Sequence, residues 1–114
     1  MACSIDGFFS PCLAVIFVDG GHEYSVAKAD LQNFKRHSHS ASILIMDDLN
    51  CQPHPWCVEP QQAWDELIAS GQVVEKRKHR WKQKVSTSAT EEVYYMRGFS
   101  VGQYTHAAAL DETI

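Results

Sequence analysis

The chain has 114 residues, of which 45% are hydrophobic and 21% are charged. This length and composition predict one small globular domain and exclude a disordered or fibrous protein. The formal net charge of −4 is modest. No run reaches the roughly 18 apolar residues that a membrane-spanning helix needs, so no membrane association is expected.

The first part of the chain predicts a strand, a helix and a second strand. Residues 1–12 read as a lead-in. The run Leu13–Val18 is apolar on both faces, which favours a strand covered by helices on both sides of its sheet. Tyr24–Phe34 predicts a helix with Ser25 as its N-cap, and Ile43–Met46 predicts a second buried strand. A βαβ unit of this kind implies two parallel strands.

A loop and a second helix are expected next. Leu49–Pro60 contains three prolines and predicts a loop. Gln61–Ser70 predicts a helix that ends at Gly71, and Trp64 on its apolar face is expected in the core.

The end of the chain predicts a β-hairpin. Val73–Lys84 and Glu92–Tyr104 read as strands joined by a turn at Ser86–Thr90, and residues 105–114 as a frayed tail. The predicted fold class is therefore α/β, in the order β-α-β-α-β-β with a terminal antiparallel hairpin. The domain is expected to span residues 13–104.

Positive charge is concentrated in the first strand of this hairpin. Residues 76–84 hold six of the ten Lys and Arg residues, with Trp81 among them. Such a run can contact nucleic acid or phosphate. A solvated strand at or near the edge of the sheet is the simpler interpretation, and nucleic-acid binding is not expected.

Acidic residues follow both predicted parallel strands. Asp19 comes directly after the first strand, and Asp47 and Asp48 come after the second. Because parallel strands lie about 4.8 Å apart, these carboxylates can share one cation at the carboxyl edge of the sheet, where open α/β sheets bind ligands. Oxygen ligands suit Mg²⁺, Mn²⁺ or Ca²⁺. Turn and cap roles are the alternative for each residue taken alone.

His22 lies three residues after Asp19, across the Gly20-Gly21 turn. A neutral imidazole beside a cation site is suited to remove a proton from a substrate. His22 is therefore the candidate general base.

These motifs resemble those of a known enzyme family. The stretch Ala14–Val74 is similar to the second half of class I S-adenosylmethionine-dependent methyltransferases, of the small-molecule and sugar O-methyltransferase type. The similarity rests on IFVDGGHEYSVAKADLQNF followed by ILIMDD. The resemblance implies Mg²⁺ or a similar cation bound by Asp19, Asp47 and Asp48, with His22 as the base. It also implies S-adenosylmethionine as methyl donor and a small-molecule hydroxyl as acceptor.

The front half of that family's fold is not recognisable in this chain. The resemblance implies a glycine-rich turn that binds the cofactor and precedes these motifs, whereas about a dozen residues precede the first clear strand. We therefore expect a partial domain, truncated or inactive alone. The alternative function is a non-catalytic interaction module, which would associate with itself or another chain through its exposed sheet edge.

Cysteines allow one further hypothesis. The chain has four, an even number that permits disulfides without requiring them. No secretory signal is recognisable, so a reduced, cytoplasmic protein is the expectation. Cys51, His54 and Cys57 follow the acidic pair and offer three possible Zn²⁺ ligands, although an ordinary loop is the simpler interpretation.

Overall fold

The two predicted apolar runs become neighbouring parallel strands in the computed structural model, which describes residues 2–5, 8–11, 13–52, 54–85 and 91–106. Strand β3 (Val15–Val18) pairs in parallel with β4 (Ile43–Asp47), and Val18 lies opposite Met46. Helix α1 (Tyr24–Lys35) connects them. The βαβ unit predicted from the sequence is therefore present.

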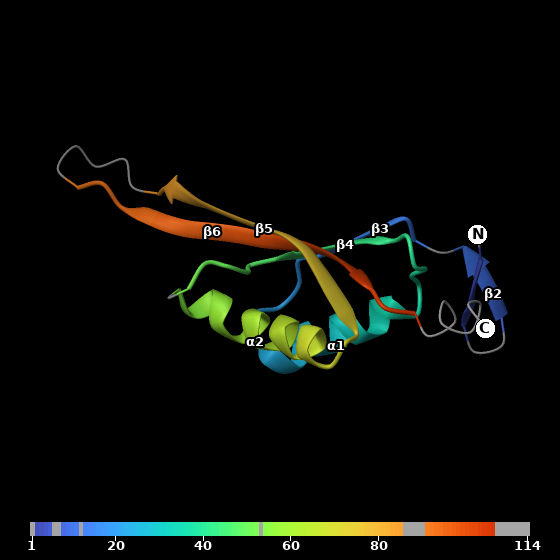
Figure 1. Cartoon of the computed structure of the whole chain (residues 1–114). Helices are drawn as coiled ribbons and strands as arrows, with labels where there is room; N and C mark the ends of the chain where they lie inside the picture. Colours follow the sequence, from blue (N-terminus) through green and yellow to red (C-terminus); the bar gives the residue numbers. More distant parts are fainter. Residues whose placement is uncertain (1, 6–7, 12, 53, 86–90, 107–114) are drawn as a thin grey trace.

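Four strands form the main sheet, in the order β3-β4-β6-β5 (Figure 1). Strands β5 (Val73–Lys84) and β6 (Tyr94–Tyr104) pair antiparallel, as predicted. Strand β6 also pairs antiparallel with β4, so the last strand lies inside the sheet. The charged strand β5 is therefore at the edge, where its Lys and Arg side chains are exposed.

Helix α2 (Pro55–Ala69) begins six residues before the predicted start at Gln61. The expectation of a loop over Leu49–Pro60 was therefore wrong in its second half. Pro55 occupies the first turn, where proline is tolerated because no helical hydrogen bond to its nitrogen is needed there. The helix continues through Pro60, whose missing N–H removes one backbone bond.

Helix α1 also begins differently from the prediction. Glu23 is its N-cap residue, without a side-chain cap bond, and Ser25 lies inside the first turn.

The hydrophobic core lies between the sheet and the two helices. Trp64 of α2 is fully buried there, as predicted, and its Nε1 donates to Glu75 Oε2 at 2.6 Å. The Tyr104 hydroxyl donates to the Leu31 carbonyl and so connects β6 to α1. Alternate residues of the strands supply the rest of the sheet side of the core: Ile16, Val18, Leu44, Met46 and Val73.

The opposite face of the sheet is not covered by α1 or α2, which lie on the same side (Figure 1). Val15 and Phe17 of β3 are 55% and 56% exposed. The expectation that this strand is covered on both faces was therefore wrong for the part of the chain that the structure describes.

Residues before β3 contain regular structure that the sequence did not predict. Strands β1 (Ala2–Ile5) and β2 (Phe8–Pro11) form a separate antiparallel pair. The predicted turn at 86–90 and residues 107–114 of the predicted tail lie outside the described residues. None of the helices in the described ranges is long and apolar enough to cross a membrane.

Beyond the end of β4, β5 and β6 continue as a two-stranded arm (Figure 1). The residue before α2 contacts the arm: His54 Nε2 accepts a hydrogen bond from the Met96 N–H at 2.9 Å. The His54 ring stacks on Trp56, with ring centroids 4.4 Å apart.

Candidate metal and base site

The three predicted carboxylates meet at the carboxyl edge of the sheet. Asp19 and Asp47 follow the paired residues Val18 and Met46, so the parallel register places them side by side. One oxygen from each of Asp19, Asp47 and Asp48 lies within 4.8 Å of the other two. Asp19 is exposed, and the other two are partly buried. The donors are all oxygens, which fits a hard divalent cation.

His22 reaches the same cluster. Its Nε2 donates to Asp48 Oδ2 at 2.8 Å, although the two residues are 26 positions apart in the chain. The side chain of His22 is 51% exposed, so it remains accessible to a ligand.

Gly20, in the turn before His22, lies close to the Asp30 side chain of α1. A Cβ on Gly20 would lie 2.5 Å from Asp30 Oδ2, so a larger residue would force the Asp30 side chain to move. The chain therefore passes close to α1 at this point and returns His22 toward Asp48.

Strand β4 ends in an uncommon backbone conformation. Asp48 and Asn50 have φ values of 59° and 61°, in the left-handed region that Asp and Asn tolerate better than most residues. Asn50 Nδ2 donates to the Phe99 carbonyl and to Ser100 Oγ, each at 3.0 Å. The left-handed loop is thereby held against β6, with the Asp48 carboxylate in bonding distance of His22.

The negative charges of the three carboxylates lie close together and repel one another. Partial burial raises the pKa of Asp47 above its ordinary value, and the charges of Asp48 and Asp19 raise it further. The Asp48 N–H and the charge of Arg97 oppose this effect. A bound cation would neutralise the repulsion, so the electrostatics also fit a metal site.

A hollow of about 430 Å³ adjoins Asp47 and Asp48 on the uncovered face of the sheet. Its apolar lining is formed by Phe17, Ile45, Trp81 and Phe99. Arg97 and Gln83 contribute polar groups to the lining. Arg97 Nε donates to Gln83 Oε1 at 2.8 Å. Sequence reasoning missed the residues from β5 and β6, because only the strand order and register bring them beside the carboxylates.

The hypothesis of a zinc site at Cys51, His54 and Cys57 was wrong. Cys51 and Cys57 form a disulfide, with Cα atoms 5.7 Å apart, and His54 accepts the bond from Met96. Neither thiolate is free to bind a metal. The bridge instead connects the loop after Asp48 to the first turn of α2, which contradicts the expectation of reduced cysteines at these two positions.

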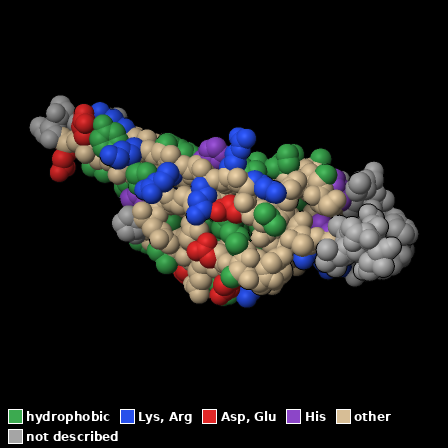
Figure 2. All heavy atoms as spheres, viewed as in Figure 1, with side chains coloured by type: hydrophobic (Ala, Val, Ile, Leu, Met, Phe, Trp, Pro, Cys, Tyr) green, Lys and Arg blue, Asp and Glu red, His purple; other side chains and the backbone are tan. Residues whose placement is uncertain are grey.

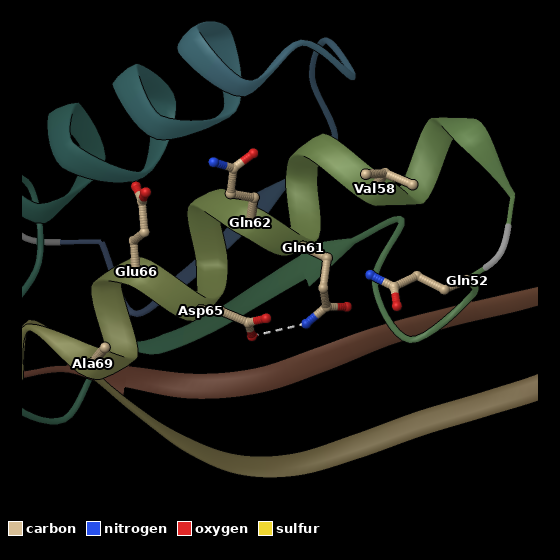
Figure 3. A pocket seen from close by; sticks show the side chains of 7 residues that line it. All are labelled: Gln52, Val58, Gln61, Gln62, Asp65, Glu66 and Ala69. Atoms are coloured by element: carbon tan, nitrogen blue, oxygen red, sulfur yellow. Dashed lines mark hydrogen bonds between the residues drawn. The ribbon is translucent and has the colours of Figure 1, made fainter.

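Another hollow, of about 500 Å³, lies along the outer side of α2 (Figure 3). Gln61 Nε2 donates to Asp65 Oδ1 at 3.0 Å within it. The residues lining it are Gln52, Val58, Gln61, Gln62, Asp65, Glu66 and Ala69. None of them belongs to the carboxylate cluster, and the group contains no histidine or cysteine, so the catalytic candidates remain at the sheet edge.

Comparisons with known proteins give one informative match. No model of a known protein family matches the chain, and no curated protein matches its sequence. A solved structure described as a "putative O-methyltransferase from Klebsiella pneumoniae" is similar, with a TM-score of 0.52 and 14% identity. The alignment covers 85% of this chain and 42% of that one, so the chain spans less than half of the similar protein. Together, the sheet, its two helices and this match show a methyltransferase-like α/β fold.

Proposed function

We propose that this chain supplies the metal-binding and general-base part of an S-adenosylmethionine-dependent O-methyltransferase site. The observation that carries the proposal is the convergence of Asp19, Asp47 and Asp48 within 4.8 Å at the carboxyl edge of the sheet. The bond from His22 to Asp48 adds a base to the same place. The solved structure that this chain resembles is described as a "putative O-methyltransferase", and this likeness in fold supports the proposal.

Asp19, Asp47 and Asp48 would hold Mg²⁺ or a similar cation. Such a cation acts as a Lewis acid and lowers the pKa of an acceptor hydroxyl. The left-handed backbone at Asp48 directs its carboxylate toward the cluster, and Asp48 has one oxygen beyond the one that accepts from His22.

His22 would accept the proton of the acceptor hydroxyl. When its Nε2–H donates to Asp48, the lone pair of the neutral ring is on Nδ1, so Nδ1 is the basic atom. Asp48 then orients the ring and stabilises the positive charge that the ring gains. The hollow beside Asp47 is a suitable place for a small acceptor, because it combines apolar walls with polar groups at one part.

The methyl donor would be held largely by polypeptide that this chain does not include. The chain matches less than half of the similar protein, so an active enzyme would need the remainder from a longer chain or a partner. A partial domain of this kind is expected to bind the cation and to lack activity alone.

Cation binding tests the proposal directly. We expect Mn²⁺ or Mg²⁺ to bind the chain in isothermal titration calorimetry, and Asp47→Asn to weaken binding by at least about tenfold through loss of a ligand. Asp65→Asn is the matched control, because Asp65 is an exposed carboxylate on α2 whose bond from Gln61 survives the change. Absence of cation binding to the wild-type chain would overturn the metal site.

A second binding experiment tests whether this chain binds the methyl donor. Equilibrium dialysis with labelled S-adenosylmethionine, with and without Mg²⁺, measures whether this chain binds it. No binding in either condition would rule out catalysis by this chain alone while leaving the metal site intact.

The uncovered apolar face favours a second candidate function, a non-catalytic interaction module. Under this alternative the chain associates with a partner while Asp47→Asn and the control Asp65→Asn behave alike in cation titrations.

A further inference from the structure

Arg97 differs in burial from most other cationic side chains of the chain. Six of the ten Lys and Arg residues lie within residues 76–84, where all are exposed, at intervals along β5 and the arm (Figure 2). Arg97 of β6 is partly buried, and its Cζ lies 5.7 Å from the ring centroid of Trp56 and 6.0 Å from that of Tyr95. Aromatic rings attract a cation at this range, so they hold the guanidinium in place.

Only part of the hydrogen-bonding capacity of Arg97 is used. Its Nε donates to Gln83 Oε1 at 2.8 Å. Among the residues that the structure describes, the terminal NH₂ groups of Arg97 and the Nε2 of Gln83 have no acceptor, and Arg97 has no ion-pair partner. A guanidinium that is partly shielded from water is well suited to bind a carboxylate or phosphate through paired hydrogen bonds.

The strand register places these donors close to the candidate metal site. Asp47 pairs with Phe99, and Arg97 lies two residues before Phe99, so its side chain is on the same face of the sheet. Two residues of an antiparallel strand span about 6.8 Å. Burial raises the pKa of Asp47, and the charge of Arg97 is near enough to oppose this rise. One small molecule can therefore contact both Arg97 and a cation at Asp47.

The hollow between these groups has aromatic walls. Phe17, Trp81 and Phe99 line it, and the rings of Trp81 and Phe99 meet edge to face with centroids 5.9 Å apart. Its volume of about 430 Å³ is within the usual range of small-molecule sites. Such walls pack well against an aromatic ring.

We propose that the acceptor at this site is a small aromatic hydroxy acid. Its carboxylate would bind Arg97 and Gln83, and its hydroxyl would lie at the cation held by Asp47. The proposal rests on the function proposed above and adds the class of substrate. An uncharged phenol would leave the donors of Arg97 unpaired in a partly buried place, which weakens binding. A carboxylate is favoured over a phosphate ester, because its single charge is repelled less by the aspartates.

A second role for Arg97 has to be distinguished from this one. Arg97 could serve only to offset the negative charge of Asp47 and Asp48. In that case its removal changes the affinity for a cation, but it does not change the choice between a charged and an uncharged ligand.

Isothermal titration calorimetry of the full chain with saturating Mg²⁺ tests the proposal, with 4-hydroxybenzoate and its uncharged isostere 4-hydroxybenzamide as probes. We expect the acid to bind at least about tenfold more tightly than the amide, because hydrogen bonds to a charged group are the stronger ones. Arg97→Gln should remove this preference, and Arg97→Lys, which lacks the paired donors, should keep only part of it. Equal affinity of the wild-type chain for acid and amide, or tighter binding of 4-hydroxyphenyl phosphate than of the acid, would overturn the proposal.

Arg80→Gln is the matched control. Arg80 is exposed and pairs with Gly98, the neighbour of Arg97, so it points to the side of the sheet that the helices cover. There it lines a different hollow, with Asn50 and Asp65. The variant loses the same charge and should keep the full preference for the acid. An equal loss of preference in Arg80→Gln and Arg97→Gln would show a general effect of charge and contradict the proposal.

Gln83→Glu tests the same contact without removing Arg97. Gln83 is exposed on the arm, and a carboxylate at this position would pair with Arg97 and repel the acid. Binding of the acid should weaken while binding of the amide stays the same, and equal weakening of both would count against a carboxylate subsite. Circular dichroism checks that each variant is folded.

Failure of this proposal and failure of the metal site give different results. A chain that binds Mg²⁺ but does not distinguish acid from amide keeps the metal site and has no carboxylate subsite. A chain that binds no Mg²⁺ but prefers the acid through Arg97 has an anion site, and the proposed function is then wrong.

Discussion

Asp48 combines a left-handed backbone with a side-chain contact to the candidate base. Its φ of 59° turns the chain at the end of β4, and its Oδ2 accepts from His22 at 2.8 Å. Left-handed backbone at a residue other than glycine costs of order 1–3 kcal/mol, and such strain clusters at functional sites. The strain at Asp48 thus supports the placement of the site at this edge of the sheet.

Asp47→Asn is expected to stabilise the cation-free protein at pH 7. Because its folded pKa is raised, the Asp47 carboxyl binds protons more readily in the folded than in the unfolded state. Its ionisation therefore lowers the free energy of unfolding as pH rises from the unfolded pKa through the folded pKa. The difference in the free energy of unfolding between the variant and the wild-type chain should disappear below about pH 4, the ordinary carboxyl pKa.

Urea unfolding at several pH values measures this difference, with Asp65→Asn as the control that should not show it. Added Mg²⁺ should make the wild-type chain more stable than Asp47→Asn at pH 7, because a ligand stabilises the folded state of the protein that binds it. A variant less stable than the wild-type chain at pH 7 without cation would contradict the interpretation of crowded charges.

At the scale of elements, the insertion of β6 between β4 and β5 determines the site. The Leu49 N–H donates to the Gly98 carbonyl at 3.1 Å, and Asn50 donates to the next two residues of β6. The disulfide between Cys51 and Cys57 holds the other end of the same loop to α2. The loop that contains Asp48 is therefore fixed on both sides.

Gly98→Ala should destabilise the protein by about 1–3 kcal/mol, the usual cost of overpacking, or more. A Cβ at Gly98 would lie 2.2 Å from the Leu49 carbonyl oxygen and 2.7 Å from that of His79, and backbone atoms cannot move aside cheaply. Urea unfolding measures the loss. Gly71→Asn is the control, since Asn tolerates the φ of +78° there and a Cβ would meet nothing within 4 Å. An equal loss in both variants would refute the steric explanation.

The whole molecule is a sheet covered on one side, with an arm beyond it. The core lies between the sheet and helices α1 and α2, whereas the described part of the arm consists of two strands that contact His54 and Trp56 near its base. Two-stranded ribbons are marginally stable in water. Stability should therefore decrease from the core toward the end of the arm.

Hydrogen exchange followed by mass spectrometry tests this gradient. Amides of Leu44 and Met46, in β4 between two strands, should exchange through global unfolding and be among the slowest. Amides of Lys82–Lys84 should exchange first among those of β5, through local opening of the arm. Uniform exchange along β5 would show that the arm is as stable as the core.

Much of the fold could be predicted from local patterns. The apolar runs that became β3 and β4, the parallel relation implied by a helix between them, and the core position of Trp64 all follow from periodicity and length. The early start of α2 could not be predicted reliably, because Pro55 and Pro60 indicate a loop unless packing of Cys57 and its neighbours favours a helix. The strands before β3 lacked a clear alternating pattern.

The sequence alone determined which side chains could form the site, because Asp19, Asp47 and Asp48 follow strands whose parallel pairing brings their ends together. Tertiary structure decided what surrounds them. The β6 insertion placed Arg97 and Phe99 beside the carboxylates, and the contact of Cys51 with Cys57 replaced a possible metal site by a disulfide. It also decided that one face of the sheet is bare. These outcomes depend on strand order and packing between distant segments, which local sequence patterns do not encode.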